Sequence, residues 1–274
     1  MPRFRCLPLL AALALSAAGC GRQSAPPAAQ VAAAPSAARV DAPTAPVPLQ
    51  DVVETTPDYI IGISYPKAAA RHPGLAKALQ AYADAARAEL LQAVSGLRGR
   101  KPSVPYDLSL QFTTLVDTPK IVAVAADGSS YTGGAHGNPL VERFTWLPEL
   151  QRMLTADRLL ASPDGWEVIA RACREQLATA LAQRLDADRL EGGERAAQLG
   201  NGTRMIDDGT QPRAENFSRF EPIVDADGRI RALRFVFPPY QVAPYSEGTR
   251  TADVPAATLL PLLAADVRPL FRGG

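Results

Sequence analysis

Residues that carry metal and redox chemistry are scarce in this sequence. Among its 274 residues there are three cysteines and two histidines, His72 and His136. A site built from several histidine ligands is therefore excluded. Cys6 and Cys20 lie in the N-terminal segment described below, which leaves Cys173 without a partner for an internal disulfide. We accordingly expect the protein to hold no metal and no other cofactor.

An excess of basic charge is also missing. The chain has 29 Lys and Arg residues against 28 Asp and Glu residues, a formal net charge of +1 at pH 7, and its basic residues form no run. Nucleic-acid-binding proteins neutralise many phosphates with clustered Lys and Arg. The balanced charge therefore argues against a nucleic-acid partner.

The start of the chain has the pattern of an export signal. Arg3 and Arg5 give it a positive beginning, and residues 7–14 form an apolar stretch too short to span a bilayer. The segment Leu-Ser-Ala-Ala-Gly-Cys at positions 15–20 is typical of a lipoprotein cleavage site. We predict that residues 1–19 are a lipoprotein signal peptide.

Cys20 would then be the lipidated first residue of the mature chain. More than one acyl chain gives stable anchoring in a lipid bilayer, so we expect attachment through acylated Cys20. Gly21 stands where an Asp would favour the inner membrane of enteric bacteria. The sequence thus predicts a cell-envelope protein at the periplasmic face of the outer membrane. Ala17 stands where such signals most often carry Leu, and ordinary secretion with cleavage nearby is the alternative.

Residues 20–50 are rich in Ala and Pro and carry few charges. They contain too few large apolar side chains to build a core, and repeated prolines favour extended, polyproline-like segments. We predict a disordered, semi-stiff tether between the lipid and the folded part of the chain.

Residues 51–272 have the composition of a globular region, either one unit or two subdomains, 51–127 and 128–272. Alternating apolar residues and short apolar runs predict strands, and apolar residues that recur every three or four positions predict helices. Residues 192–212 show neither pattern and should be irregular. The predicted strands are 58–65, 104–112, 121–125, 140–146, 220–224 and 230–237, and the predicted helices are 73–96, 163–185 and 255–270. This order indicates an α+β fold, mainly an antiparallel sheet packed with a few amphipathic helices.

Patterns of catalytic residues are weak. Ser64 and Lys67 have the Ser-x-x-Lys spacing of penicillin-binding enzymes, but the Ser-Asp-Asn and Lys-Thr-Gly motifs that accompany it are missing. Cys173 lies on an apolar helical stripe, which favours a buried structural residue over a nucleophile. Four acidic residues show no spacing that singles out a catalytic pair. They are Asp107, Asp117, Glu142 and Glu149.

Two segments stand out as candidate recognition elements. Residues 131–138, Tyr-Thr-Gly-Gly-Ala-His-Gly-Asn, hold three glycines in five positions, which suits either a partner-binding loop or a tight crossing of the chain. Residues 237–248, Phe-Pro-Pro-Tyr-Gln-Val-Ala-Pro-Tyr-Ser-Glu-Gly, end a predicted strand with two prolines. Tyr240 and Tyr245 either brace this corner or line a groove for a glycan or a protein loop.

Together these two segments resemble the bacterial extracytoplasmic domain of the RsiV anti-sigma factors, which sense lysozyme, and of PdaC-type peptidoglycan deacetylases. The resemblance extends over most of residues 52–271. It implies an α+β fold and a non-catalytic role in the cell envelope, with lysozyme recognition known only in some members. The sensing members carry a transmembrane helix and a cytoplasmic sigma-binding segment where this chain has its lipid signal. We therefore do not expect an anti-sigma factor of that architecture.

The sequence thus predicts a membrane-anchored envelope lipoprotein that is not an enzyme and binds lysozyme-like proteins or peptidoglycan. A cell-envelope hydrolase with an unrecognised active site is the alternative. The predicted binding residues come from the two segments that carry the resemblance. They are Tyr131, Gly133, Gly134, His136, Gly137, Asn138, Tyr240 and Tyr245.

Overall fold

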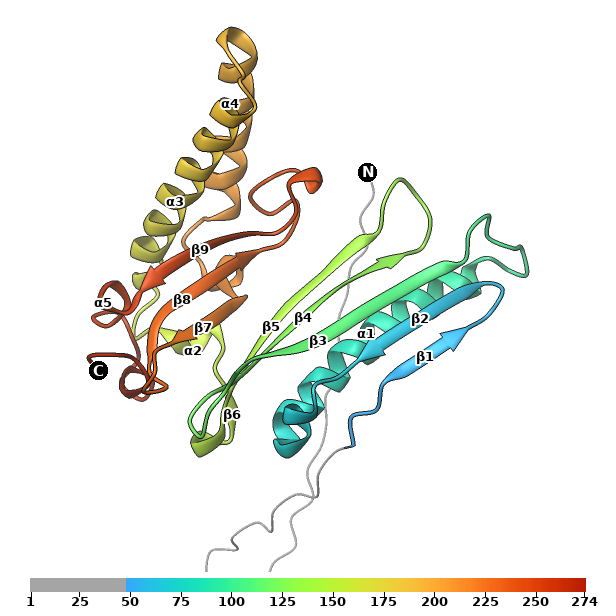
Figure 1. Ribbon diagram of the computed structural model, residues 1–274, viewed down its shortest axis with the longest axis horizontal. Helices are drawn as coiled ribbons and strands as arrows, with labels where there is room; N and C mark the ends of the chain where they lie inside the picture. Colours follow the sequence, from blue (N-terminus) through green and yellow to red (C-terminus); the bar gives the residue numbers. More distant parts are fainter. Residues whose placement is uncertain (1–47) are drawn as a thin grey trace, which may run out of the picture. The chain divides into compact units, whose positions relative to one another are not determined.

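A computed structural model describes residues 48–274 of the chain, and Figure 1 shows how their helices and strands are arranged. The predicted signal peptide, Cys20 and most of the predicted tether lie outside the described residues. The predicted α+β class is confirmed, because two mainly antiparallel sheets pack with a small number of helices. Between residues 48 and 274, no helix combines the length and the apolar character that crossing a membrane requires.

The first sheet has six strands in the order of the sequence. Neighbouring strands run antiparallel except β2 and β3, which are parallel. A parallel pair needs a crossover connection, and a helix, α1, supplies it. The elements are β1 (Val52–Thr55), β2 (Tyr59–Ser64), α1 (Pro73–Gly96), β3 (Tyr106–Asp117), β4 (Val122–Tyr131), β5 (Asn138–Leu147) and β6 (Arg152–Met153).

Helix α1 covers one face of the six-stranded sheet (Figure 1). Its apolar residues recur every three or four positions, so Leu75, Leu79 and Leu90 are fully buried against the sheet. Pro73 occupies the first turn, where its missing N–H costs no hydrogen bond. Each fully buried Leu contributes about 1.5–3 kcal/mol, so this face holds the helix in place.

The second sheet has three antiparallel strands in the order β7–β8–β9, and a long helix, α3, packs on it. The predicted hairpin of residues 220–237 is confirmed, with Gly228 at φ +73° in its turn. The predicted stripe on α3, including Cys173, is buried. The elements are α2 (Ala156–Leu159), α3 (Gly165–Ala187), α4 (Gly192–Gly209), β7 (Phe220–Val224), β8 (Ile230–Phe237), β9 (Arg250–Pro255) and α5 (Ala256–Leu259).

Residues 192–212 were predicted to be irregular, and this prediction is wrong, because residues 192–209 form helix α4. The segment has few apolar residues and several glycines, each of which disfavours a helix by up to about 1 kcal/mol. Packing on α3 overrides this preference. Ile206 is buried in the core around α3. A Cβ at Gly202 would lie only 2.6 Å from a methyl carbon of Leu181, so the two helices approach closely there.

The predicted helix of residues 255–270 is also wrong. Helix α5 ends at Leu259, and only a short 3-10 helix follows at Arg268–Leu270. Pro261 explains the early end, because a proline has no N–H to donate and its ring clashes with the preceding turn. Strands β1 and β9 were not predicted. They are short, at four and six residues. The division considered between residues 127 and 128 lies within β4.

Within residues 48–274, five short 3-10 helices connect the larger elements. They are η1 (Lys67–Arg71), η2 (Pro148–Leu150), η3 (Ala214–Phe217), η4 (Tyr245–Glu247) and η5 (Arg268–Leu270). Two of them matter for the sites below, because η4 carries Tyr245 and η3 forms one wall of a groove.

Candidate functional site

The two segments singled out in the sequence meet in space. His136 lies in the loop between β4 and β5, and Tyr240 and Tyr245 lie in the loop between β8 and β9. The hydroxyl of Tyr240 is 2.8 Å from Nε2 of His136, and the ring of Tyr245 stacks on the imidazole with centroids 4.0 Å apart. The two tyrosine rings are 5.6 Å apart. We call these three residues the histidine–tyrosine cluster.

The second ring nitrogen of His136 makes a hydrogen bond within its own loop. Its Nδ1 lies 3.1 Å from the carbonyl oxygen of Gly137. A carbonyl only accepts hydrogen bonds, so Nδ1 carries a proton, and in the neutral form of the imidazole Nε2 accepts from the Tyr240 hydroxyl. The side chain of His136 is otherwise exposed. The imidazole is therefore held between its own loop and the loop from the other sheet.

The glycines of the β4–β5 loop place His136. Gly133 and Gly134 have φ values of +100° and +104°, a region that side chains with a Cβ rarely adopt. The hydroxyl of Tyr131 donates to the carbonyl oxygen of Gly134 at 3.3 Å and ties the loop to the end of β4. Asn138 begins β5 and pairs with Ser130 of β4. All of the loop residues predicted for binding therefore lie at one end of this hairpin.

Tyr240 has a strained backbone and an exposed ring. Its φ is +73°, and its side chain and backbone together remain 55% exposed. For a residue with a Cβ this conformation costs roughly 1–2 kcal/mol. The surrounding loop compensates, since the N–H of Tyr240 donates to the carbonyl oxygen of Ala243 at 3.0 Å. Strain of this kind is often kept where function requires a particular side-chain position.

Gln241 anchors the same loop, a role that the sequence patterns did not reveal. Its side-chain N–H₂ group donates to the carbonyl oxygens of Gly209 and Asn216, at 3.0 and 2.9 Å. Those carbonyls lie at the end of α4 and in η3, so one amide joins the loop to two other elements. The buried end of the loop is thus fixed, and Tyr240 beside it is presented to solvent. The contacts of Tyr240 and Tyr245 with His136 are those of a braced corner, and binding of a glycan or a protein loop stays a prediction.

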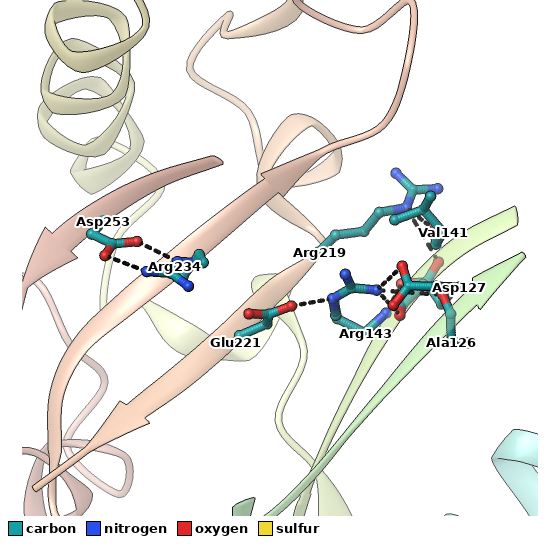
Figure 2. A network of polar contacts seen from close by, with 9 residues as sticks. Ala126, Asp127, Val141, Arg143, Arg219, Glu221, Arg234 and Asp253 are labelled. Carbon is teal, nitrogen blue, oxygen red and sulfur yellow. Dashed lines mark hydrogen bonds and ion pairs between the residues drawn. The ribbon is translucent and has the colours of Figure 1, made fainter. Parts of the chain in front are cut away.

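A second set of polar contacts joins the two sheets and is centred on Arg143 of β5 (Figure 2). The side chain of Arg143 is only 8% exposed. Its Nε donates to Glu221 of β7 at 2.5 Å, and its Nη1 donates to Asp127 of β4 at 3.0 Å. Beside it, Nε of Arg219 donates to the carbonyl oxygen of Val141 at 2.7 Å. Nothing in the predicted site pointed to this network, which joins residues of three strands, with Arg143 and Glu221 lying 78 positions apart in the sequence.

A groove of about 440 Å³ lies next to Arg143. Its walls come from α1, β5, β6, α2 and η3, and six apolar side chains line most of it. The lining residues are Ala78, Glu142, Arg143, Phe144, Met153, Leu154, Thr155, Ala156, Asp157, Ala214, Glu215 and Ser218. Its volume is in the range of pockets that bind small molecules or single peptide segments.

Two of the acidic residues considered for hydrolysis lie far apart. Asp107 and Asp117 lie at opposite ends of β3, about 33 Å apart at the rise of a strand, and Asp117 pairs with Arg71. Within residues 48–274, no group of three or more His, Cys, Asp or Glu side chains is placed to hold a metal ion. Ser64 ends β2, and Lys67 begins η1 after Pro66.

Cys173 is fully buried on α3. Burial raises the pKa of its thiol to about 12, because the apolar surroundings disfavour the thiolate. A thiol in that state is a poor nucleophile.

These features define a class of protein, an α+β fold with two mainly antiparallel sheets whose loops join in an exposed histidine–tyrosine cluster. No protein-family model matches the chain, and no curated protein matches it. A solved structure of a DUF3298 family protein from Pseudomonas aeruginosa PAO1 has a TM-score of 0.50 and 17% identity, and the match covers 84% of this chain and 98% of that chain. This likeness shows a shared fold.

A second solved structure is a member of the DUF3298 family from Bacteroides fragilis NCTC 9343. It has a TM-score of 0.44 and 14% identity, and the match covers 80% of this chain and 93% of that chain. The resemblance to the RsiV and PdaC domains stays a prediction from the sequence segments.

Proposed function

We propose that this protein is a non-catalytic binding module of the bacterial cell envelope, which recognises a lysozyme-like protein or peptidoglycan through the histidine–tyrosine cluster. One observation carries the proposal. His136 and Tyr240 are 104 positions apart in the sequence, yet they form a hydrogen bond of 2.8 Å. The two segments on which the resemblance rests therefore make one exposed surface.

The chemistry of the cluster suits recognition better than catalysis. Tyrosine offers a flat apolar ring and a hydroxyl at little cost in conformational entropy, which is why it is enriched where proteins bind partners. The stacked His136 and Tyr245 rings hold Tyr240 in one position before any ligand arrives. Such preorganisation reduces the ordering cost of binding. A partner would meet the exposed Tyr240 ring first.

Titration calorimetry tests this proposal with the full chain, using a lysozyme and soluble muropeptides as separate ligands. We expect one of the two ligand classes to bind wild type, and His136→Ala to weaken that binding about tenfold, as a central interface residue does. His72→Ala is the matched control, because His72 precedes α1 and takes no part in the cluster. Absence of binding by wild type to both ligand classes would refute the proposal.

The membrane anchor is a separate part of the proposal. Cys20 is proposed to carry acyl chains that tether the module to the outer membrane through residues 20–50. Cys20→Ser should move the protein from the membrane to the soluble fraction and abolish labelling by a radioactive fatty acid. Cys173→Ala, which changes the buried thiol, should leave both unchanged. If wild type takes up no fatty acid, the lipoprotein proposal fails while the binding proposal stands.

A further inference from the structure

We propose that the groove beside Arg143 is a second binding site, which takes a peptide segment carrying an apolar side chain next to a basic one. Its residues differ from those of the histidine–tyrosine cluster, so this proposal does not depend on the function proposed above. The groove has an apolar lining, an acidic rim and one arginine nitrogen without a hydrogen-bond partner in the described part of the chain.

The floor of the groove favours an apolar side chain. Phe144, Met153 and Leu154 line it together with three alanines. Phe144 and Met153 are only partly buried, although both pack against the core beneath α1. An incoming aliphatic side chain would remove this surface from water, which is worth roughly 25 cal/mol per Å² of apolar area.

The rim of the groove favours positive charge. Asp157 and Glu215 are both exposed at its edge. The only ion pair of Asp157 in the described part of the chain is a long one, 3.9 Å, with its neighbour Arg158, and Glu215 has none there. The carboxylate of Glu142 lies 3.6 Å from Nε of Arg219 and is already compensated. These two exposed carboxylates, one with a long ion pair and one with none in the described residues, complement a Lys or Arg side chain beside an apolar floor.

Arg143 adds a donor that suits a peptide backbone. Its Nε and Nη1 are occupied by Glu221, Asp127 and two carbonyl oxygens. Its Nη2 has no hydrogen-bond partner within residues 48–274, and Figure 2 shows this nitrogen without a contact. Because the side chain of Arg143 lines the groove, a carbonyl oxygen of a bound segment would accept a hydrogen bond from this nitrogen. This requirement favours a peptide over a simple amine.

Methionine methyl signals offer a direct reporter. The chain has three methionines, of which Met153 lines the groove and Met205 lies on α4. The full chain, labelled with ¹³C at the methionine methyl groups, is titrated with three short peptides capped at both ends. They are Lys-Leu-Lys, Glu-Leu-Glu and Lys-Ser-Lys. We expect only Lys-Leu-Lys to shift the Met153 signal saturably, with the Met205 signal unchanged.

Charge variants make the test specific. Asp157→Asn with Glu215→Gln should weaken the binding of Lys-Leu-Lys about fivefold, as the loss of two exposed ion pairs does. The matched control, Glu175→Gln with Glu194→Gln, removes the same charge from exposed positions on α3 and α4 and should bind like wild type. Tyr240→Ala should also bind like wild type, which separates this site from the cluster.

Several results would overturn the proposal. One is an unmoved Met153 signal at about 10 mM Lys-Leu-Lys, a concentration that detects millimolar affinity. Another is an equal shift with Glu-Leu-Glu. A third is a shift caused by a neutral chito-oligosaccharide and by none of the peptides, which would assign the groove to a glycan.

Discussion

At the scale of single residues, two glycines of the first sheet differ in the space that a Cβ would have. Gly128 of β4 lies against β3, where a Cβ would be 2.0 Å from the carbonyl oxygen of Ser109. Gly62 of β2 has no atom within 4 Å of the position that a Cβ would take. The two residues share a sheet and a residue type, but only Gly128 is required by its surroundings.

Gly128→Ala should therefore lower the free energy of unfolding by about 3 kcal/mol or more, because backbone atoms of β3 must move. Gly62→Ala should leave it unchanged or raise it by up to about 1 kcal/mol, since glycine is unfavourable inside a strand. Urea unfolding of both variants measures the difference. Equal losses in the two variants would contradict the close approach of β3 and β4.

The chemistry of Cys173 could be predicted from the sequence, because its place on an apolar stripe already indicated burial. The structure confirms the burial and adds its consequence. With a pKa raised to about 12, the group stays a protonated thiol at pH 7 to 9, and only the thiolate reacts readily.

We expect a chain with Cys6→Ser and Cys20→Ser to resist a thiol reagent at pH 8 while it is folded. In urea the thiol regains an ordinary pKa and should react at once. With a thiol reagent that releases a chromophore, absorbance measures the reaction rates of the folded and the urea-unfolded protein. Reaction of the folded protein at the rate of free cysteine would show that Cys173 is accessible, against the structure.

At the scale of elements, the spacing of apolar residues predicted the helices that pack through a continuous apolar stripe of their own. Helices α1 and α3 were predicted to within about two residues at each end, because their buried residues recur at helical spacing. Helix α4 was missed because its stability comes from contact with α3, which no local pattern encodes. The meeting of the two recognition segments could not be predicted either. The spacing of residues along the chain does not indicate that the β4–β5 loop contacts the β8–β9 loop.

Gln241, next to Tyr240, shows how contacts with α4 and η3 can position the cluster. Gln241→Ala removes two hydrogen bonds and leaves two carbonyl oxygens without their donor, so it should cost about 1–3 kcal/mol of stability. It should also free the β8–β9 loop and shift the imidazole signals of His136, which hydrogen-bonds Tyr240. Urea unfolding and ¹⁵N NMR of the two histidines measure these effects.

Gln176→Ala is the control for Gln241. Its side-chain amide also bonds to backbone, in this case to the edge strand β9 at Asp253. This variant should lose stability without moving the His136 signals. If Gln241→Ala leaves those signals in place as well, the amide does not position the cluster.

At the scale of the whole molecule, two hydrophobic clusters have to be joined. One lies beneath α1, and the other lies around α3 and the second sheet and includes Val116, Ala123 and Leu147 of the first sheet. Periodicity in the sequence indicated many of the apolar residues of both, but the contact between β5 and β7 includes the ion pair of Arg143 and Glu221, which are 78 positions apart. The pattern of apolar and polar residues along a sequence assigns such charged residues to the protein surface. Their burial follows from the way the two sheets meet, which local sequence cannot specify.

Arg143→Met should therefore destabilise the protein by about 3 kcal/mol, because it leaves Glu221, whose side chain is 17% exposed, without its cation. Arg143→Met with Glu221→Leu should recover most of this loss, since the uncompensated charge is gone as well. Arg71→Met, which breaks the exposed pair with Asp117, should cost no more than about 1 kcal/mol. Urea unfolding compares the three variants. If Arg143→Met costs no more than Arg71→Met, the buried pair does not join the sheets, and the apolar contacts between them suffice.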